Sequence, residues 1–233
     1  MLSSVSRPRE STARRPPTRS GPHVGPSPMH RFEPRPPVVI GIVGGIAAGK
    51  STVAALFEEA GLVRVDADAE ARRATAAPSI LAALAARFGP EVLRPDGQLD
   101  RAALARIVFR DRAAKADLEA ITHPVIRAAI LDRIARSHAE GRSVLLDAPL
   151  LLEGPLAGRC DAIVFVEAST ETRRARAIAR GWTEEEWRSR ERSQLDLALK
   201  RAAARATIAN DGDLDDTRRQ VADFLARWPI ADP

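Results

Sequence analysis

The sequence has few of the residues that support disulfide-rich or aromatic folds. Its 233 residues include one cysteine, Cys160, and no tyrosine, and aromatic side chains make up 4% of the chain. A single cysteine excludes an intramolecular disulfide and a zinc site built from cysteines. The core must therefore consist of Ala, Leu, Val and Ile, which favours helices and buried parallel strands. Because free thiols persist in reducing compartments, we expect the protein in the cytoplasm.

Long hydrophobic segments are also missing. No apolar run reaches the ~18 residues that a membrane-spanning helix needs. No apolar stretch of about 7 to 15 residues follows the basic N-terminus, which argues against a secretory signal. We therefore expect a soluble protein that has no membrane partner.

The basic residues are concentrated at the N-terminus. The chain has 36 Lys and Arg against 31 Asp and Glu, a net charge of +5. Residues 1–37 hold seven Arg against Glu10 and Glu33, and the rest of the chain carries 29 charges of each sign. Because the remainder is neutral, we do not expect the folded part to bind nucleic acid.

The first 37 residues form a segment of unusual composition. They contain nine of the 17 prolines and almost no periodic apolar residues, so we expect a disordered basic tail. Three explanations are open for it: translation that begins at Met29, an arm that contacts nucleic acid or acidic surfaces, or an organellar transit peptide whose helix the prolines would break.

Apolar runs and helical periodicity alternate from residue 38 onward. This alternation predicts an α/β fold with a parallel sheet flanked by helices. Strands are expected at residues 38–43, 62–65, 143–146, 162–166 and 207–209. Helical segments are expected at residues 50–60, 69–140, 169–205 and 213–227, with breaks at Pro78, Gly89–Gly97, Pro124 and Gly181.

A glycine-rich turn joins the first predicted strand to the first helix. Residues 44–51 read GGIAAGKS and match the phosphate-loop pattern G-x-x-x-x-G-K-[ST]. Small residues let the backbone N–H groups surround a phosphate at the helix N-terminus. Lys50 is expected to neutralise the β- and γ-phosphate oxygens of ATP, and Ser51 to ligate Mg²⁺. The expected ATP-binding residues of the loop are Gly45, Ile46, Ala47, Ala48, Gly49, Lys50, Ser51 and Thr52.

The three lysines, Lys50, Lys115 and Lys200, help to exclude classes of phosphate-loop protein. None of them lies in an N-K-x-D guanine motif, which argues against a GTPase. An L-S-G-G-Q-like helix start, typical of ABC-type ATPases, is also missing. Because a phosphate loop alone does not specify a reaction, these absences leave a compact kinase of a small substrate as the favoured class.

Several short motifs follow the phosphate loop in order. They are Asp66-Ala67-Asp68 with Arg72, Asp96-Gly97 with Leu99, Arg101, Leu104 and Phe109, His123-Pro124 with Ile126, Pro149–Glu153, and the residues Arg176, Arg180, Gln194, Lys200, Asn210 and Gly212. Together with residues 41–52, this order resembles the dephospho-CoA kinase family from about Val38 to Leu225. The chain departs from the family pattern at Gly181 and Arg205, where aspartate is common, which affects local lid contacts.

The resemblance implies an activity and an architecture. The expected reaction is ATP-dependent phosphorylation of the ribose 3′-hydroxyl of dephospho-CoA with Mg²⁺, the last step of coenzyme A synthesis. The alternative is another P-loop nucleotide or small-molecule kinase. The expected P-loop NTPase-type core comprises residues 38–68, 141–168 and 206–228, with a helical acceptor-binding insertion at 69–140 and a helical lid at 169–205. The sequence predicts no oligomeric state.

Three aspartates follow predicted strands. The resemblance assigns the catalytic base to Asp68, where a carboxylate lies across the crevice from the loop. Asp66 is interpreted as a helix N-cap, an alternative that is also open for Asp68. Asp147 either holds Mg²⁺ through water or caps the next turn.

Basic residues are candidates for binding both substrates. Arg72, His123 and Arg127 are expected to meet the phosphates of the acceptor, although His123 is also interpreted as a satisfied histidine at a helix kink. Arg176 and Arg180 share one helix face and are expected to close over the triphosphate.

Two neighbouring arginines and the lone thiol are expected to have no role in the reaction. Arg173 and Arg174 belong to the same basic run, and we interpret them as part of a solvated face. Cys160 is expected to be a buried small residue.

Overall fold

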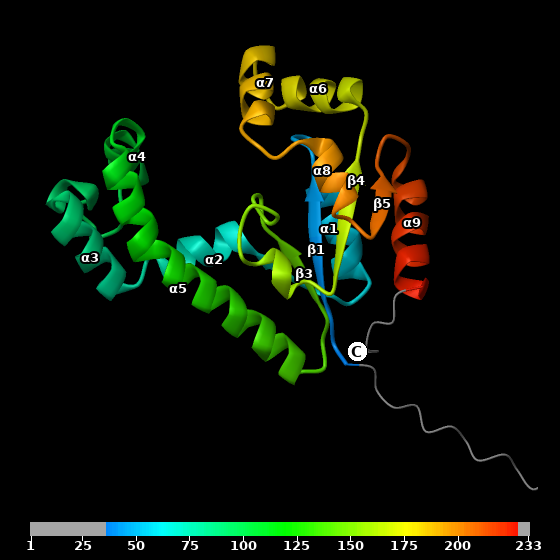
Figure 1. Ribbon diagram of the computed structural model, residues 1–233, viewed down its shortest axis with the longest axis horizontal. Coiled ribbons are helices and arrows are strands. Elements are labelled where there is room, and N and C mark those ends of the chain that lie inside the picture. Colours follow the sequence, from blue (N-terminus) through cyan, green and yellow to red (C-terminus); the bar gives the residue numbers. More distant parts are fainter. Residues whose placement is uncertain (1–35, 228–233) are drawn as a thin grey trace, which may run out of the picture. The chain divides into compact units, whose positions relative to one another are not determined.

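The computed structural model describes residues 36–227, so the predictions for residues 1–35 of the tail lie outside the described range (Figure 1). Within that range, five parallel strands form a sheet in the order β2-β3-β1-β4-β5. The strands are β1 Val39–Gly44, β2 Val63–Asp66, β3 Val144–Asp147, β4 Ala162–Glu167 and β5 Ala206–Ala209. The predicted α/β fold with a parallel sheet is confirmed.

Helices connect the strands and cover the sheet. They are α1 Lys50–Glu59, α2 Ala67–Ala74, α3 Pro78–Phe88, the short 3₁₀ turn η1 Pro90–Val92, α4 Arg101–Arg110, α5 Arg112–Ala139, the turn η2 Ala157–Arg159, α6 Thr170–Ala179, α7 Glu184–Arg192, α8 Leu197–Ala202 and α9 Leu214–Arg227. None of these helices has the length and hydropathy needed to cross a membrane.

Alternate side chains of β1 enter two separate apolar layers. Ile42 packs in one cluster with Phe57 of α1 and Phe224 of α9. Val43 packs in a second cluster with Ile130 of α5. Because both faces of the strand are buried, the uninterrupted run of β-branched residues in β1 fits a central parallel strand.

Helix α5 takes part in two cores. Ala114, near its start, packs with Leu84 and Phe88 in a cluster formed by α3, α4 and α5, whereas Ile130 packs against the sheet. The predicted break at Pro124 is wrong, because α5 runs through this residue. Proline in a helix interior costs about 3 kcal/mol. Burial of the helix on both sides of Pro124 offsets that cost and keeps α5 continuous.

The predicted helical segment at residues 169–205 contains three helices. The expected break at Gly181 is confirmed, and a second break separates α7 from α8. Asp196 ends this second break, because its side chain accepts a hydrogen bond from the Ala198 amide at 2.7 Å and caps α8.

Candidate active site

The phosphate loop lies between the end of β1 and the start of α1, as the sequence predicts. Ala47 has φ 61° and Gly49 has φ 89°, so the backbone turns through left-handed conformations in this segment. Such turns aim successive N–H groups into one concave site. At the start of α1, the N–H groups of Lys50 and Ser51 have no main-chain acceptor among the described residues and extend this donor set. The loop therefore offers main-chain donors to an anion.

Side chains from the C-terminal half of the chain hold one side of the loop. Asn210, in the connection between β5 and α9, donates from Nδ2 to the Ala48 carbonyl at 2.8 Å. Arg176 of α6 donates to the same carbonyl at 3.2 Å and to the Asn210 carbonyl at 2.8 Å. A Cβ on Gly49 would lie 2.1 Å from the Asn210 Nδ2, so only glycine fits here. Arg176 therefore lies against the loop, and its predicted contact with the triphosphate stays a prediction.

Arg173 lies against the beginning of the loop, at Gly45. It is 3% exposed, which overturns its interpretation as part of a solvated face. Its guanidinium pairs with Glu191 of α7, donates to the Ala168 carbonyl at 3.2 Å and lies over the Trp187 ring. A Cβ on Gly45 would lie 2.9 Å from Arg173 Nη1. The α6 and α7 segment is thus packed directly onto the loop.

The two other arginines of the basic run differ in their surroundings. Arg174 is exposed and pairs with Glu184 at 2.6 Å, as expected for a solvated face. Arg180 is also exposed, and its charge lowers the pKa of Lys50. Its charge therefore reaches the region of the loop lysine.

Lys50 is partly buried among charges of both signs. Burial is the main cause that lowers the pKa of Lys50, the Asp147 carboxylate opposes this effect, and Arg180 adds to it. An incoming polyphosphate would supply the negative charge that this group of residues lacks. The electrostatics of the site therefore favour a strongly anionic ligand.

Two aspartates end neighbouring strands at the same edge of the sheet. Asp66 and Asp147 are register partners in β2 and β3. The Asp66 carboxylate accepts a hydrogen bond from the Ala69 amide at 2.9 Å and caps α2, as predicted. Within residues 36–227 no backbone N–H donates to Asp147, so it caps no turn there; its carboxylate instead accepts from Arg64 Nη2 at 2.6 Å. Neither alternative proposed for Asp147 includes this ion pair.

Asp68 lies two residues after the cap, in the first turn of α2. Its side chain is exposed, and no residue in the described range donates a hydrogen bond to it. The N-cap interpretation left open for Asp68 is therefore wrong, since Asp66 fills that position. The structure leaves the Asp68 carboxylate available to a ligand.

The residues predicted to bind the acceptor line two pockets. His123 and Arg127, one turn apart on α5, line a pocket of about 270 Å³ with Pro155 and Leu156. Arg72, one turn after Asp68 on α2, lines another pocket of about 360 Å³. That pocket is also lined by Thr75, Ala76, Arg94, Gln98, Leu99, Asp100 and Arg101. Arg72 therefore lines a different pocket from His123 and Arg127.

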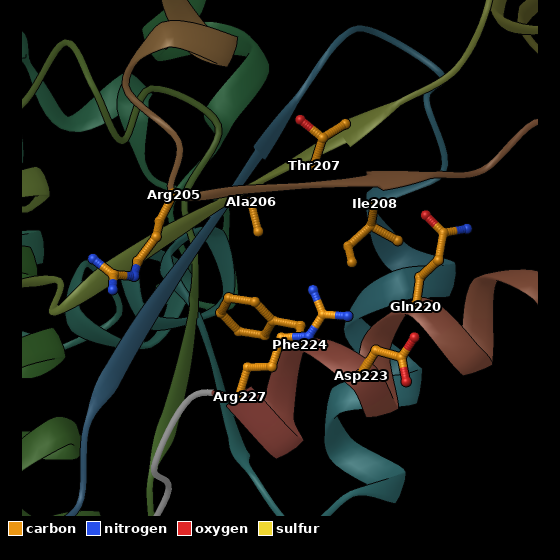
Figure 2. A pocket seen from close by; sticks show the side chains of 8 residues that line it. All are labelled: Arg205, Ala206, Thr207, Ile208, Gln220, Asp223, Phe224 and Arg227. Carbon is orange, nitrogen blue, oxygen red and sulfur yellow. The ribbon is translucent and has the colours of Figure 1, made fainter.

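A further pocket of about 340 Å³ lies along the edge strand β5 and helix α9 (Figure 2). None of the predicted binding residues lines it. Arg205, which departs from the family pattern, is exposed and extends away from the side chains of α9. This pocket is therefore separate from the phosphate loop.

Comparison with known proteins identifies the family. A sequence model described as dephospho-CoA kinase matches residues 38–216. The chain belongs to the dephospho-CoA kinase family. The family phosphorylates dephospho-CoA in the final step of coenzyme A biosynthesis, so the resemblance stated from the motifs is confirmed.

Individual members of the dephospho-CoA kinase family match most of the chain. The dephospho-CoA kinase of Symbiobacterium thermophilum is 43% identical over 196 residues, which cover 83% of this chain and 81% of the relative. That of Geobacillus kaustophilus is 40% identical over 195 residues, covering 82% and 96%. The crystal structure of TT1252 from Thermus thermophilus has a TM-score of 0.72 at 39% identity, covering 84% of this chain and all of that one.

The donor chemistry near Lys50 fits the cation that dephospho-CoA kinases, like other ATP-dependent kinases, generally require. Ser51 offers a hydroxyl at the start of α1, and Asp147 offers a half-buried carboxylate whose Oδ2 is held by Arg64. Oxygen donors of this kind suit Mg²⁺. No three His, Cys, Asp or Glu side chains within residues 36–227 form a metal cluster. Phosphate oxygens and water would therefore supply the other ligands, as is usual for Mg²⁺.

Nothing in the sequence predicts the ion pair of Arg64 or the burial of Arg173, because both depend on tertiary partners. Lys200 belongs to the ordered family motifs and is one of three lysines in the chain, but the sequence predicts no contact for it. Nothing in the local sequence distinguishes Arg173 from Arg174.

Proposed function

We propose that this chain transfers the γ-phosphoryl group of ATP to the ribose 3′-hydroxyl of dephospho-CoA, giving coenzyme A and ADP. The observation that carries the proposal is the pairing of two features in a member of this family. A phosphate loop holds the partly buried ammonium of Lys50, and a carboxylate without a protein partner, Asp68, follows the strand at the same sheet edge.

ATP binding is assigned to the loop and to the helix packed on it. Main-chain N–H groups of residues 45–52 surround the phosphates, and Lys50 neutralises their developing charge. Arg176 fixes the Ala48 carbonyl and so holds the loop in shape, while Arg180 contributes positive charge from the exposed face of α6. In this proposal, residues 169–205 form the lid that excludes water from the triphosphate.

A divalent cation belongs to the same proposal. Ser51 and Asp147 are the protein groups assigned to hold Mg²⁺ with the phosphates of ATP. When bound, the cation would supply charge neutralisation to the phosphates of ATP.

Asp68 is assigned as the general base. The 3′-hydroxyl oxygen attacks the γ-phosphorus, the bond from that phosphorus to the β,γ-bridging oxygen breaks, and ADP leaves with the bond's electron pair. The hydroxyl proton passes to the Asp68 carboxylate. Because phosphoryl transfer has a loose transition state, most of the catalysis comes from holding these groups in line.

Both pockets, which are lined by residues of the helical insertion at 69–140, are assigned to the acceptor, an elongated molecule. Arg72 lies one turn from Asp68 on α2, so it is assigned to phosphate oxygens close to the reacting ribose. His123 and Arg127 are assigned to another part of the same acceptor, in their own pocket. One extended molecule thus accounts for two separate groups of basic residues.

The test is a substrate panel. Coupled ADP release is measured with dephospho-CoA, adenosine, AMP and pantothenate, and the product with dephospho-CoA is identified by mass spectrometry and comparison with authentic coenzyme A. Of the four acceptors, we expect only dephospho-CoA to give turnover with ATP, and we expect no turnover with any acceptor in the Lys50→Met variant. Equal or faster turnover with AMP or adenosine would replace this proposal by a different small-molecule kinase.

A further inference from the structure

Lys200 occupies an unusual place in helix α8. It is 2% exposed, whereas the adjacent Leu199 is 56% exposed. A short surface helix ordinarily buries its leucine and exposes its lysine. Burying an ammonium group is costly unless it is paired. The inversion therefore indicates that the amino group of Lys200, and not apolar burial, accounts for a lysine at this position.

The ammonium of Lys200 contacts the entrance of the phosphate loop. Its Nζ donates to Gln194 Oε1 at 2.7 Å and lies 3.5 Å from the carbonyl of Gly44, the last residue of β1. Gln194 lines a pocket of about 540 Å³ together with Gly45 and Ile46. Lys200 thus lies behind the beginning of the loop.

No carboxylate of the described residues forms an ion pair with Lys200. Glu191 pairs with Arg173, and Glu153 accepts a hydrogen bond from the Leu195 amide at 3.1 Å. Burial is the main cause that lowers the pKa of Lys200, and nearby Lys50 lowers it further, while Glu153 and Glu191 raise it. The protein therefore leaves two neighbouring ammonium groups incompletely neutralised.

Bound phosphates would supply the missing negative charge. Lys50 is assigned to contact those phosphates directly, whereas Lys200 is covered by protein and contacts main chain and amide oxygens. A buried charge that does not touch the ligand acts on it in two ways. It holds the loop in shape, and its electrostatic field attracts the phosphates, most strongly where water is excluded.

We propose that Lys200 is a positioning residue of the phosphate loop, which fixes the Gly44 carbonyl and Gln194 and strengthens the binding of the ATP phosphates from behind the loop. The inference rests on the proposed use of ATP, but not on the identity of the acceptor.

The test compares three variants. Lys200→Met keeps the length and apolar stem of the side chain but removes its charge and donors. Lys200→Arg keeps the charge. Lys115→Met makes the same chemical change at a lysine of α5 whose side chain is 63% exposed. Isothermal titration calorimetry measures Kd for Mg·ATP and Mg·ADP, and thermal unfolding without ligand measures the stability of each variant.

We expect Lys200→Met to raise the Kd of Mg·ATP by about tenfold or more and that of Mg·ADP by less, because an electrostatic effect scales with ligand charge. Lys200→Arg should stay within about threefold of the parent, and Lys115→Met within about twofold. A purely structural lysine would instead lower the unfolding temperature and leave the Kd ratio of the two nucleotides unchanged, which would overturn the proposal.

Two further readouts keep the result decisive. If Lys200→Met does not fold, Gln194→Met removes the hydrogen-bond acceptor and leaves the charge, and unchanged nucleotide binding in that variant would reject the positioning role. If the parent binds Mg·ATP and loses it with Lys200→Met but never phosphorylates dephospho-CoA, the proposed function fails while the role of Lys200 stands.

Discussion

The aspartates Asp66 and Asp68, separated by Ala67, allow the proposed base to be tested by a matched pair of substitutions. Asp66→Asn and Asp68→Asn each replace one carboxylate by an amide of the same shape. Asparagine caps helices about as well as aspartate, so Asp66→Asn preserves the bond to the Ala69 amide. Asp68 has no protein hydrogen bond to lose. We therefore expect the free energy of unfolding of both variants to lie within about 0.5 kcal/mol of that of the parent protein.

The kinetic effects of the two substitutions should differ strongly. Removal of a general base typically lowers kcat by about 10²-fold or more, and a hundredfold loss corresponds to about 2.7 kcal/mol of transition-state stabilisation. We expect this loss for Asp68→Asn, with KM for ATP unchanged. Asp66→Asn should retain kcat within about threefold, because its carboxylate is engaged by the α2 backbone.

The assay combines coupled ADP release at saturating ATP and dephospho-CoA with chemical denaturation of each variant. Asp66→Ala serves as a positive control for stability, since loss of a cap costs about 1 kcal/mol. Asp68 is not the general base if Asp68→Asn changes only the KM for dephospho-CoA, or if Asp66→Asn lowers kcat as much as Asp68→Asn does. Either result would assign Asp68 to binding or move the base to Asp66.

Two further predictions concern the loop and the lone thiol. Gly49→Ala should abolish Mg·ATP binding in calorimetry, and retained binding would contradict the close contact between Asn210 and the loop. Gly61→Ala is the control, because Gly61 has a similar φ of 95° with no atom within 4 Å of the added Cβ. This control should lose about 1 to 2 kcal/mol of stability from left-handed strain and still bind Mg·ATP. Burial raises the pKa of the Cys160 thiol from 9.0 to about 11. The contribution of Cys160 to stability is therefore present below pH 9 and is lost as the pH rises to about 11. At pH 8 the native thiol should react with a disulfide reagent about a hundredfold more slowly than the thiol of the denatured protein, and equal rates would show that the native thiol is accessible.

The sheet and the phosphate loop were predictable because their signals are local. Residues 39–44 form an unbroken apolar strand, and the glycine and lysine pattern that follows needs no distant partner to be recognised. The same holds for the cap at Asp66, since its hydrogen bond reaches only three residues along the chain. The roles of Asp68 and Arg72 in the reaction stay predictions that the proposed experiments test.

Features that depend on distant partners were not predictable. Arg173 and Arg174 are neighbours in one basic run, yet only Arg173 finds Glu191, Trp187 and the Ala168 carbonyl around it. Asp147 follows its strand as a metal-binding carboxylate would, but its partner Arg64 lies on another strand.

Continuity of α5 through Pro124 has a consequence for how the protein unfolds. The segment has 28 residues, and its two ends are buried in different apolar clusters. If either cluster unfolds, α5 loses part of its packing and the other cluster loses the residues that α5 contributes to it, so denaturation should proceed as a single cooperative transition. For the same reason, a fragment that carries only the helical insertion, residues 69–140, would expose to water the apolar residues of α5 around Ile130 that face the sheet, and it should aggregate.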